Sequence, residues 1–169
     1  MTAPFRLEPL APGHARASFA CGVAALDHYL AAQAGQDVRR RVSACYVALE
    51  SVSGAVAGYY TLAACGVALT DLPADWAKRL PRYPSVPVAR VGRLAIDQRF
   101  QGRQLGSALL ADAAVRAARS EVAVFALVVD AKDDRAARFY QHHGFEPFGA
   151  HGLQLAVPLK RFITSRTTS

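Results

Sequence analysis

The chain of 169 residues contains little sulfur, with three cysteines and one methionine. Cys21, Cys45 and Cys65 lie far apart, without a C-x-x-C pair or a histidine at ligand spacing. This spacing excludes the usual structural zinc sites, so we expect no bound metal. An odd number of cysteines among apolar neighbours favours buried free thiols in a reducing compartment.

Long apolar runs, internal repeats and low-complexity segments are also absent. No stretch approaches the roughly 18 apolar residues that a membrane-spanning helix needs. Residues 1–19 carry prolines and charges where a secretory signal peptide needs an uninterrupted apolar stretch. We therefore expect a cytoplasmic protein with no membrane segment.

The charge is unbalanced towards the basic side. The chain has 20 Lys and Arg against 13 Asp and Glu, a net charge of +7, and 52% of its residues are hydrophobic. This composition and length predict a single packed domain over residues 1–169. The excess charge either serves solubility or attracts a polyanion. Clustering favours the polyanion, and the clustered residues are Arg39, Arg40, Arg41, Lys78, Arg79, Arg82, Arg90, Arg93, Arg99 and Arg103.

Hydrophobic periodicity predicts a mixed α/β (α+β) domain. Residues 70–87, which contain four prolines, are predicted to form a loop with at most one short helix after Leu72. Predicted helices cover 23–36, 104–119 and 133–144. Predicted strands cover 5–10, 43–50, 55–69, 88–97, 122–130, 145–149 and 153–162.

Residues 97–117, "DQRFQGRQLGSALLADAAVRA", place a glycine-bearing turn between a strand and a helix. Backbone N–H groups and the positive end of the helix dipole converge at such a turn, which favours a pyrophosphate there. The stretch has no G-x-G-x-x-G, and Ser107 stands where a Walker lysine would be, so NAD and Mg-ATP are poor candidates. The alternative is an ordinary connection whose glycines serve only the turn.

This stretch resembles the acetyl-CoA pyrophosphate loop of the GCN5-related N-acetyltransferase (GNAT) family, Arg/Gln-x-x-Gly-x-Gly/Ala. Gln101 and Gly106 match the pattern, whereas Gln104 stands where the family usually has its first glycine. Gln104 suits the loop at negative φ, and positive φ would cost roughly 1 kcal/mol. Residues 133–148, "DDRAARFYQHHGFEPF", are similar to a second family segment, with Asp133 in place of the usual Asn.

The resemblance implies the GNAT fold, a mixed and mostly antiparallel sheet flanked by helices, with a splay between strands 91–97 and 122–130. It implies acetyl-CoA as co-substrate and Tyr140 as the acid that protonates the leaving thiolate. Tyr140 packing only against its aromatic neighbours is the structural alternative. The implied acetyl-CoA contacts are Leu94, Ala95 and Ile96 for the pantetheine arm, Gln101, Gly102, Arg103, Gln104, Leu105, Gly106 and Ser107 for the pyrophosphate, and Asp133. We expect the backbone N–H groups of residues 102–107 to hold the phosphates.

A general base is missing from the central strand. Residues 91–97 contain no glutamate, and Asp97 at the strand end is expected to be a turn residue. His142 and His143 are expected at the surface or at a helix cap. Without a strong base the acceptor should be an amine that is already largely neutral. An α-amino group, with a pKa of about 8, fits this better than lysine at about 10.4.

The segments 26–49, 56–63, 88–110 and 139–145 resemble the toxin branch of the family, which acetylates charged tRNA. That resemblance implies a homodimer and a ribbon-helix-helix antitoxin as partners. Basic residues could then contact tRNA phosphates, namely Arg39, Arg40, Lys78, Arg79, Arg82, Arg90 and Arg93. Two alternatives stay open. One is a housekeeping acetyltransferase for a small amine or a protein N-terminus. The other is a non-catalytic module that binds CoA or nucleic acid, which the departures at Gln104 and Asp133 motivate.

Overall fold

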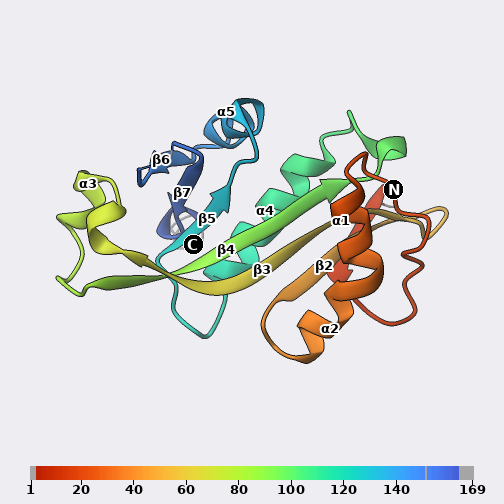
Figure 1. The fold of residues 1–169 in the computed structure, drawn as a ribbon, viewed down its shortest axis with the longest axis horizontal. Coiled ribbons are helices and arrows are strands. Elements are labelled where there is room, and N and C mark those ends of the chain that lie inside the picture. Colours follow the sequence, from red (N-terminus) through yellow and green to blue (C-terminus); the bar gives the residue numbers. More distant parts are fainter. Residues whose placement is uncertain (1–2, 151, 164–169) are drawn as a thin grey trace, which may run out of the picture. The chain divides into compact units, whose positions relative to one another are not determined.

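The computed structural model describes residues 3–150 and 152–163. Within these ranges seven strands form a sheet in the hydrogen-bonded order β1-β2-β3-β4-β5-β7-β6 (Figure 1). The pairs β1–β2, β2–β3, β5–β7 and β6–β7 are antiparallel, and β4–β5 is parallel. The expected mixed, mostly antiparallel sheet is therefore confirmed. The strands are β1 Phe5–Pro9, β2 Ala44–Glu50, β3 Val56–Ala68, β4 Ser85–Ile96, β5 Ala126–Asp130, β6 Glu146–Phe148 and β7 Gln154–Pro158.

Helices follow the predicted order, with differences at the boundaries. They are α1 Ala24–His28, α2 Ala34–Arg39, α3 Ala74–Ala77, α4 Leu105–Ala118, α5 Asp134–His142 and α6 Lys160–Ile163. The strand predicted over 122–130 begins only at Ala126, and the strand predicted over 153–162 ends at Pro158, where α6 soon follows. Strand β4 begins earlier than predicted, within the proline-rich segment. Pro87 has no N–H to donate, but its carbonyl accepts a hydrogen bond from Phe125 N at 2.8 Å.

The described residues form two compact units. Unit 1 contains the residues up to Ala63 together with Gly92–Ala113, and unit 2 contains Ala64–Val91 and the residues from Ala114 onward. The prediction of a single domain stays a prediction.

In unit 1 helices cover both faces of β3. Side chains alternate between the faces of a strand, so Tyr59 and Tyr60 point in opposite directions. Tyr59 packs with the buried residues of the α1–α2 region, and its hydroxyl donates to Leu26 O at 2.8 Å. Tyr60 donates to Asp112 of α4 at 2.6 Å. Figure 1 shows α1 and α2 beside β2 and β3, with α4 on the other side. This double cover explains why Val56–Thr61 are all buried.

The helix predicted over 23–36 is interrupted between α1 and α2. Residues Tyr29–Gln33 form a π-helical segment, in which Ala34 N bonds to Tyr29 O. The wider turn inserts Tyr29 and Leu30 into the core of unit 1, where Tyr29 is 4% exposed and Leu30 is 0% exposed. Such π-turns often mark functional sites.

Unit 2 has its own core between its strands and α3. Val88 of β4, Val128 of β5 and Ala156 of β7 are fully buried there, and Trp76 packs edge-on against Phe125 with ring centroids 6.1 Å apart. All three cysteines are free, as expected. Cys45 in unit 1 is buried, as expected, whereas Cys21 and Cys65 are only half-buried.

Candidate acetyl-CoA loop and acid residue

The glycine-bearing turn lies between the end of β4 and the start of α4, as predicted. Asp97 caps a short 3-10 helix, Gln98–Phe100, and residues 101–104 then lead into Leu105, the first residue of α4. The carbonyl of Gln104 accepts the first helical hydrogen bond, from Ala108 N at 3.2 Å. The N–H groups of Leu105 and Gly106 therefore belong to the first turn, where helices bind anions.

Asp97 anchors this turn to the rest of unit 1. Its carboxylate is 1% exposed and accepts hydrogen bonds from Ala20 N at 3.0 Å and from Arg99 N at 2.9 Å. The Arg99 guanidinium adds an ion pair at 3.0 Å. Burial raises the pKa of Asp97, but the hydrogen bonds from Arg99 and Ala20 outweigh burial and hold it below its usual value. An ionised, fully engaged carboxylate is a turn anchor, as expected, rather than a base.

The Gln101 side chain holds the turn in place through two hydrogen bonds to backbone carbonyls. Its side-chain amide donates to Ile96 O at 3.0 Å and to Cys21 O at 3.2 Å. These two bonds tie the turn to the end of β4 and to the segment before α1. The side chain predicted to belong to the pyrophosphate site thus fixes the backbone of the turn.

The backbone of the turn has positive φ at two alternating positions. Gly102 has φ of 82° and Gln104 has φ of 60°, on either side of Arg103. Gln104 therefore does not take the negative φ that suits a non-glycine residue, but adopts the left-handed conformation of the glycine it replaces. Alternation of left- and right-handed residues turns successive N–H groups towards one side and forms an anion-binding concavity.

Positive charge lies close to this turn. Arg103 has a side chain that is 57% exposed, and its guanidinium carbon lies 5.5 Å from the Phe100 ring centroid. Glu50 is its ion-pair partner at 3.9 Å, a loose contact that an incoming phosphate can replace.

Strand β4 carries the segment predicted to contact the pantetheine arm. Its parallel pairing with β5 runs from Val88↔Ala126 to Val91↔Val129, and β4 then continues to Ile96 while β5 ends at Asp130. Ala95 is 6% exposed in the core of unit 1 and Leu94 is half-buried. The Ile96 carbonyl is already bonded to Gln101, so it is the Ile96 atom least available to a ligand.

Tyr140 lies on α5 in unit 2. Its side chain is 9% exposed and packs against Phe139 and Phe145, with ring centroids 5.3 Å and 5.7 Å away. Burial raises the pKa of Tyr140, and the negative charge of Asp130 raises it further. The phenol therefore keeps its proton at neutral pH, which is the state a general acid needs.

The ends of α5 are formed as the sequence predicts. Asp133 caps its N-terminus, with the carboxylate accepting from Ala136 N at 2.8 Å. Gly144 follows the helix with φ of 89°, the left-handed conformation typical of a C-terminal cap. His142 is exposed, as expected, while the half-buried His143 packs against Phe139 with ring centroids 4.8 Å apart.

The predicted phosphate-binding residues divide into two groups. One group is exposed, with members in each unit: Arg39 and Arg40 in unit 1, and Lys78, Arg79 and Arg82 in unit 2.

Arg90 and Arg93 on β4 are instead half-buried. Arg90 pairs with Asp130 at 2.6 Å, and the guanidinium carbon of Arg93 lies 3.6 Å from the ring centroid of Tyr29. The Tyr29 hydroxyl donates to Asp37 at 2.8 Å. Sequence reasoning missed this cluster around Tyr29, because its members are far apart in the chain.

Comparison with known proteins identifies the class to which this fold and loop belong. The family model "Acetyltransferase (GNAT) domain" matches residues 41–147. The chain belongs to the GNAT acetyltransferase family.

Individual relatives are more specific. The chain is 37% identical to a tRNA-acetylating toxin of Mycobacterium tuberculosis, over 85% of each chain. It is 27% identical to a probable toxin TacT of Sinorhizobium fredii, over 90% of each. Among solved structures, AtaT in complex with acetyl-methionyl-tRNAfMet is 29% identical with a TM-score of 0.87, covering 96% of this chain and 99% of that one.

Two features are absent from the described ranges, 3–150 and 152–163. No helix there is both long and apolar enough to cross a membrane. No group of three or more His, Cys, Asp or Glu in the same ranges is arranged to hold a metal ion.

Proposed function

We propose that this protein transfers the acetyl group of acetyl-CoA to the α-amino group of an aminoacyl-tRNA and thereby blocks translation. The observation that carries the proposal is the 37% identity to a tRNA-acetylating toxin over 85% of both chains. Solved relatives point the same way, since AtaT was determined with acetyl-methionyl-tRNAfMet and, as AtaTR, with acetyl-CoA.

The turn of unit 1 would hold the pyrophosphate of acetyl-CoA. Its backbone N–H groups over residues 102–107 supply the donors, the dipole of α4 favours the negative charge, and Arg103 adds a mobile cation. Leu94, Ala95 and Ile96 are assigned to the pantetheine arm. The Gln101 side chain acts by fixing the turn, and Asp133 by capping α5.

Tyr140 would supply the proton that the leaving group needs. A bond forms between the amine nitrogen and the acetyl carbon, the carbon–sulfur bond breaks, and its electron pair stays on sulfur. The sulfur takes the phenolic proton of Tyr140, while the amine releases its own proton to water. An α-amino group has a pKa close enough to neutral pH to react without a strong base. Asp97 is not needed as a base, in agreement with its burial and its hydrogen bond from Ala20 N.

The same relatives support an antitoxin as a partner. AtaT has been solved with the C-terminus of the antitoxin AtaR. We assign this chain an antitoxin partner of the ribbon-helix-helix type, a homodimeric state and a cytoplasmic location.

Induced expression tests the proposal in cells. Growth should stop, and mass spectrometry of the charged tRNA pool should show one or a few aminoacyl groups heavier by one acetyl group. Tyr140→Phe should restore growth, whereas Tyr83→Phe, a change at a side chain that is 68% exposed in unit 2, should not. Growth arrest with an unmodified tRNA pool would contradict the proposed reaction.

A further inference from the structure

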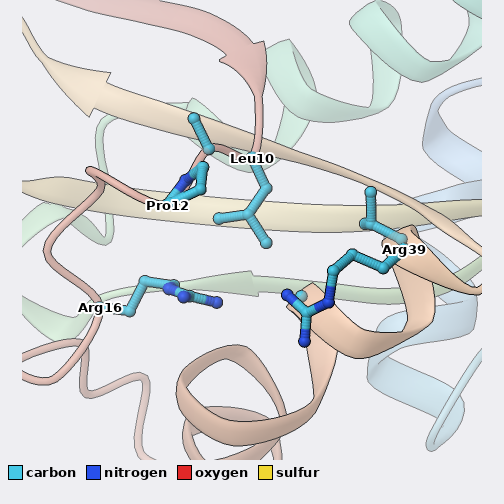
Figure 2. Close-up of a pocket in the computed structure, with 7 residues that line it drawn as sticks. Leu10, Pro12, Arg16 and Arg39 are labelled. Atoms are coloured by element: carbon cyan, nitrogen blue, oxygen red, sulfur yellow. The ribbon is translucent and has the colours of Figure 1, made fainter.

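A small pocket with two arginines lies in unit 1, between the segment after β1 and helix α2. Its volume is about 150 Å³. We call it the arginine pocket, and the residues that line it include Leu10, Pro12, Arg16, Gly35, Val38 and Arg39. Figure 2 shows the Arg16 and Arg39 side chains pointing toward one another from opposite sides, with Leu10 between them.

The two guanidinium groups converge over Gly35. A Cβ built on Gly35 would lie 3.3 Å from Arg39 Nη1 and 3.5 Å from Arg16 Nη1. The distance between these two Nη1 atoms therefore cannot exceed the sum of the two distances. Glycine leaves the floor of the pocket open, in a helix where it costs about 1 kcal/mol relative to alanine.

The charge of this pair is not balanced within the part of the chain that the structure describes. Arg16 donates to the carbonyl of Leu30 at 3.2 Å, and neither Arg16 nor Arg39 forms an ion pair with a described carboxylate. Two cations this close repel each other, and one anion between them would turn the repulsion into two charge-assisted hydrogen bonds.

We infer that the arginine pocket binds one backbone phosphate of the tRNA substrate, an inference that rests on the proposed function. The volume is well below the roughly 300 Å³ of pockets that hold whole small molecules, so a single anionic group fits and a nucleoside does not. A backbone phosphate has two charged oxygens, so each of the two guanidinium groups can donate to one of them. A carboxylate has the same number, so the choice of a phosphate rests on the proposed tRNA substrate and on the cations beside the pocket.

The surface next to the pocket has the same sign of charge. Arg40 and Arg41 follow Arg39 directly and are exposed. A polyanion with a second phosphate beyond the pocket would meet these cations, which an isolated acidic side chain would not use. This assigns Arg16, which no sequence motif singled out, to the RNA-binding surface.

Binding of purified tRNA across a range of salt concentrations tests the inference. Arg16→Gln and Arg39→Gln should each weaken binding about tenfold. The double variant should lose less tRNA affinity than the product of the two single fold losses, because both arginines hold the same phosphate. The slope of log affinity against log salt should fall by about one in the double variant, and not by two. Arg6→Gln, the same change at an exposed arginine of β1, is the matched control.

Gly35→Leu separates the pocket from its charge. The larger side chain fills the space beneath both guanidinium groups, keeps the net charge and suits a helix. It should weaken tRNA binding as the arginine variants do, with a melting temperature no lower than that of the parent. If Gly35→Leu binds like the parent and the pocket variants bind like Arg6→Gln, the pocket is not a phosphate site.

Two further measurements separate the possible failures. Acetyl transfer to charged tRNA by the parent protein tests the proposed function and does not depend on the pocket variants. An oligoglutamate peptide of matched charge is used as a competitor of tRNA. If it displaces tRNA as well as an RNA oligonucleotide does, and only from proteins with an intact pocket, the pocket selects carboxylates and the inference is wrong.

Discussion

At the scale of single residues, Tyr140 is the proposed acid that protonates the leaving thiolate. Replacing its phenol by phenyl removes one oxygen and leaves the contacts with Phe139 and Phe145 in place. We expect Tyr140→Phe to lower kcat about 10²–10⁴-fold, the usual contribution of a positioned acid, and to change the affinity for acetyl-CoA little. Steady-state kinetics with isothermal calorimetry measure both. A Tyr140→Phe variant that works at the parental rate would remove the acid role.

Two other buried groups make stability depend on alkaline pH. Burial raises the pKa of Cys45 from 9.0 to about 12, and burial with the hydrogen bond to Asp37 raises the pKa of Tyr29 from 10.0 to about 12. Both pKa values are higher in the folded state, so the unfolded chain loses its protons first as the pH rises. The free energy of unfolding should therefore hold steady below pH 9 and fall between about pH 9 and 12.

Urea unfolding between pH 8 and 11 measures this fall. Cys45→Ala removes one of these groups, so its free energy of unfolding should fall less steeply than that of the parent above pH 9. A parental free energy that stays constant through pH 10.5 would contradict the assigned burial of both groups.

At the scale of elements, the turn between β4 and α4 combines positive φ with an anion site. Gln104→Gly should raise the free energy of unfolding by up to about 1 kcal/mol, because glycine adopts φ of 60° without steric cost. Gly102→Ala should lower it by about 1 kcal/mol, and only through the backbone, since no atom lies within 4 Å of the added Cβ.

Acetyl-CoA affinity distinguishes the functional part of this prediction. Gln104→Gly should leave the affinity within about threefold of the parent if the backbone holds the phosphates. Gly102→Ala should weaken it. Arg41→Gly is the control, because Arg41 also has a positive φ, of 61°, but lies outside the turn. An Arg41→Gly variant that changes acetyl-CoA affinity as much as Gly102→Ala would argue against a pyrophosphate site in the turn.

The sequence predicted most elements because periodicity and turn residues are local signals. It predicted α4 within one residue at either end, and it placed Asp133 and Gly144 at the caps of α5. It did not predict the π-helical segment after α1, where packing of Tyr29 and Leu30 overrides the helical repeat. Nor did it predict the sign of φ at Gln104, which depends on how the whole turn closes.

The candidate site was predictable in its backbone and less so in its side chains. The spacing of Gln101 and Gly106 located the turn between β4 and α4. The role of Tyr140 as the acid stays a prediction. Arg90 and Arg93 were grouped with the surface cations, yet their partners are Asp130 and Tyr29. These partners lie 40 or more positions away in the chain, so only the folded register brings them together.

At the scale of the whole molecule, the net charge of +7 agrees with the proposed tRNA substrate, a proposal that rests on the likeness to a tRNA-acetylating toxin. The exposed arginines and lysine of the two units attract a polyanion at long range, and the arginine pocket adds a binding site for one phosphate in unit 1. Charge alone would not distinguish a nucleic-acid binder from an enzyme. The reaction decides between them.

Reconstituted acetyl transfer shows whether this protein acetylates charged tRNA. Purified protein, acetyl-CoA and charged tRNA are mixed, the aminoacyl adenosine is released by nuclease, and its mass and fragmentation are measured. We expect an acetyl group on the α-amino nitrogen of the aminoacyl ester, formed with charged tRNA and not with uncharged tRNA. Acetyl-CoA turnover that proceeds equally well with free amines, and leaves the charged tRNA unmodified, would contradict it.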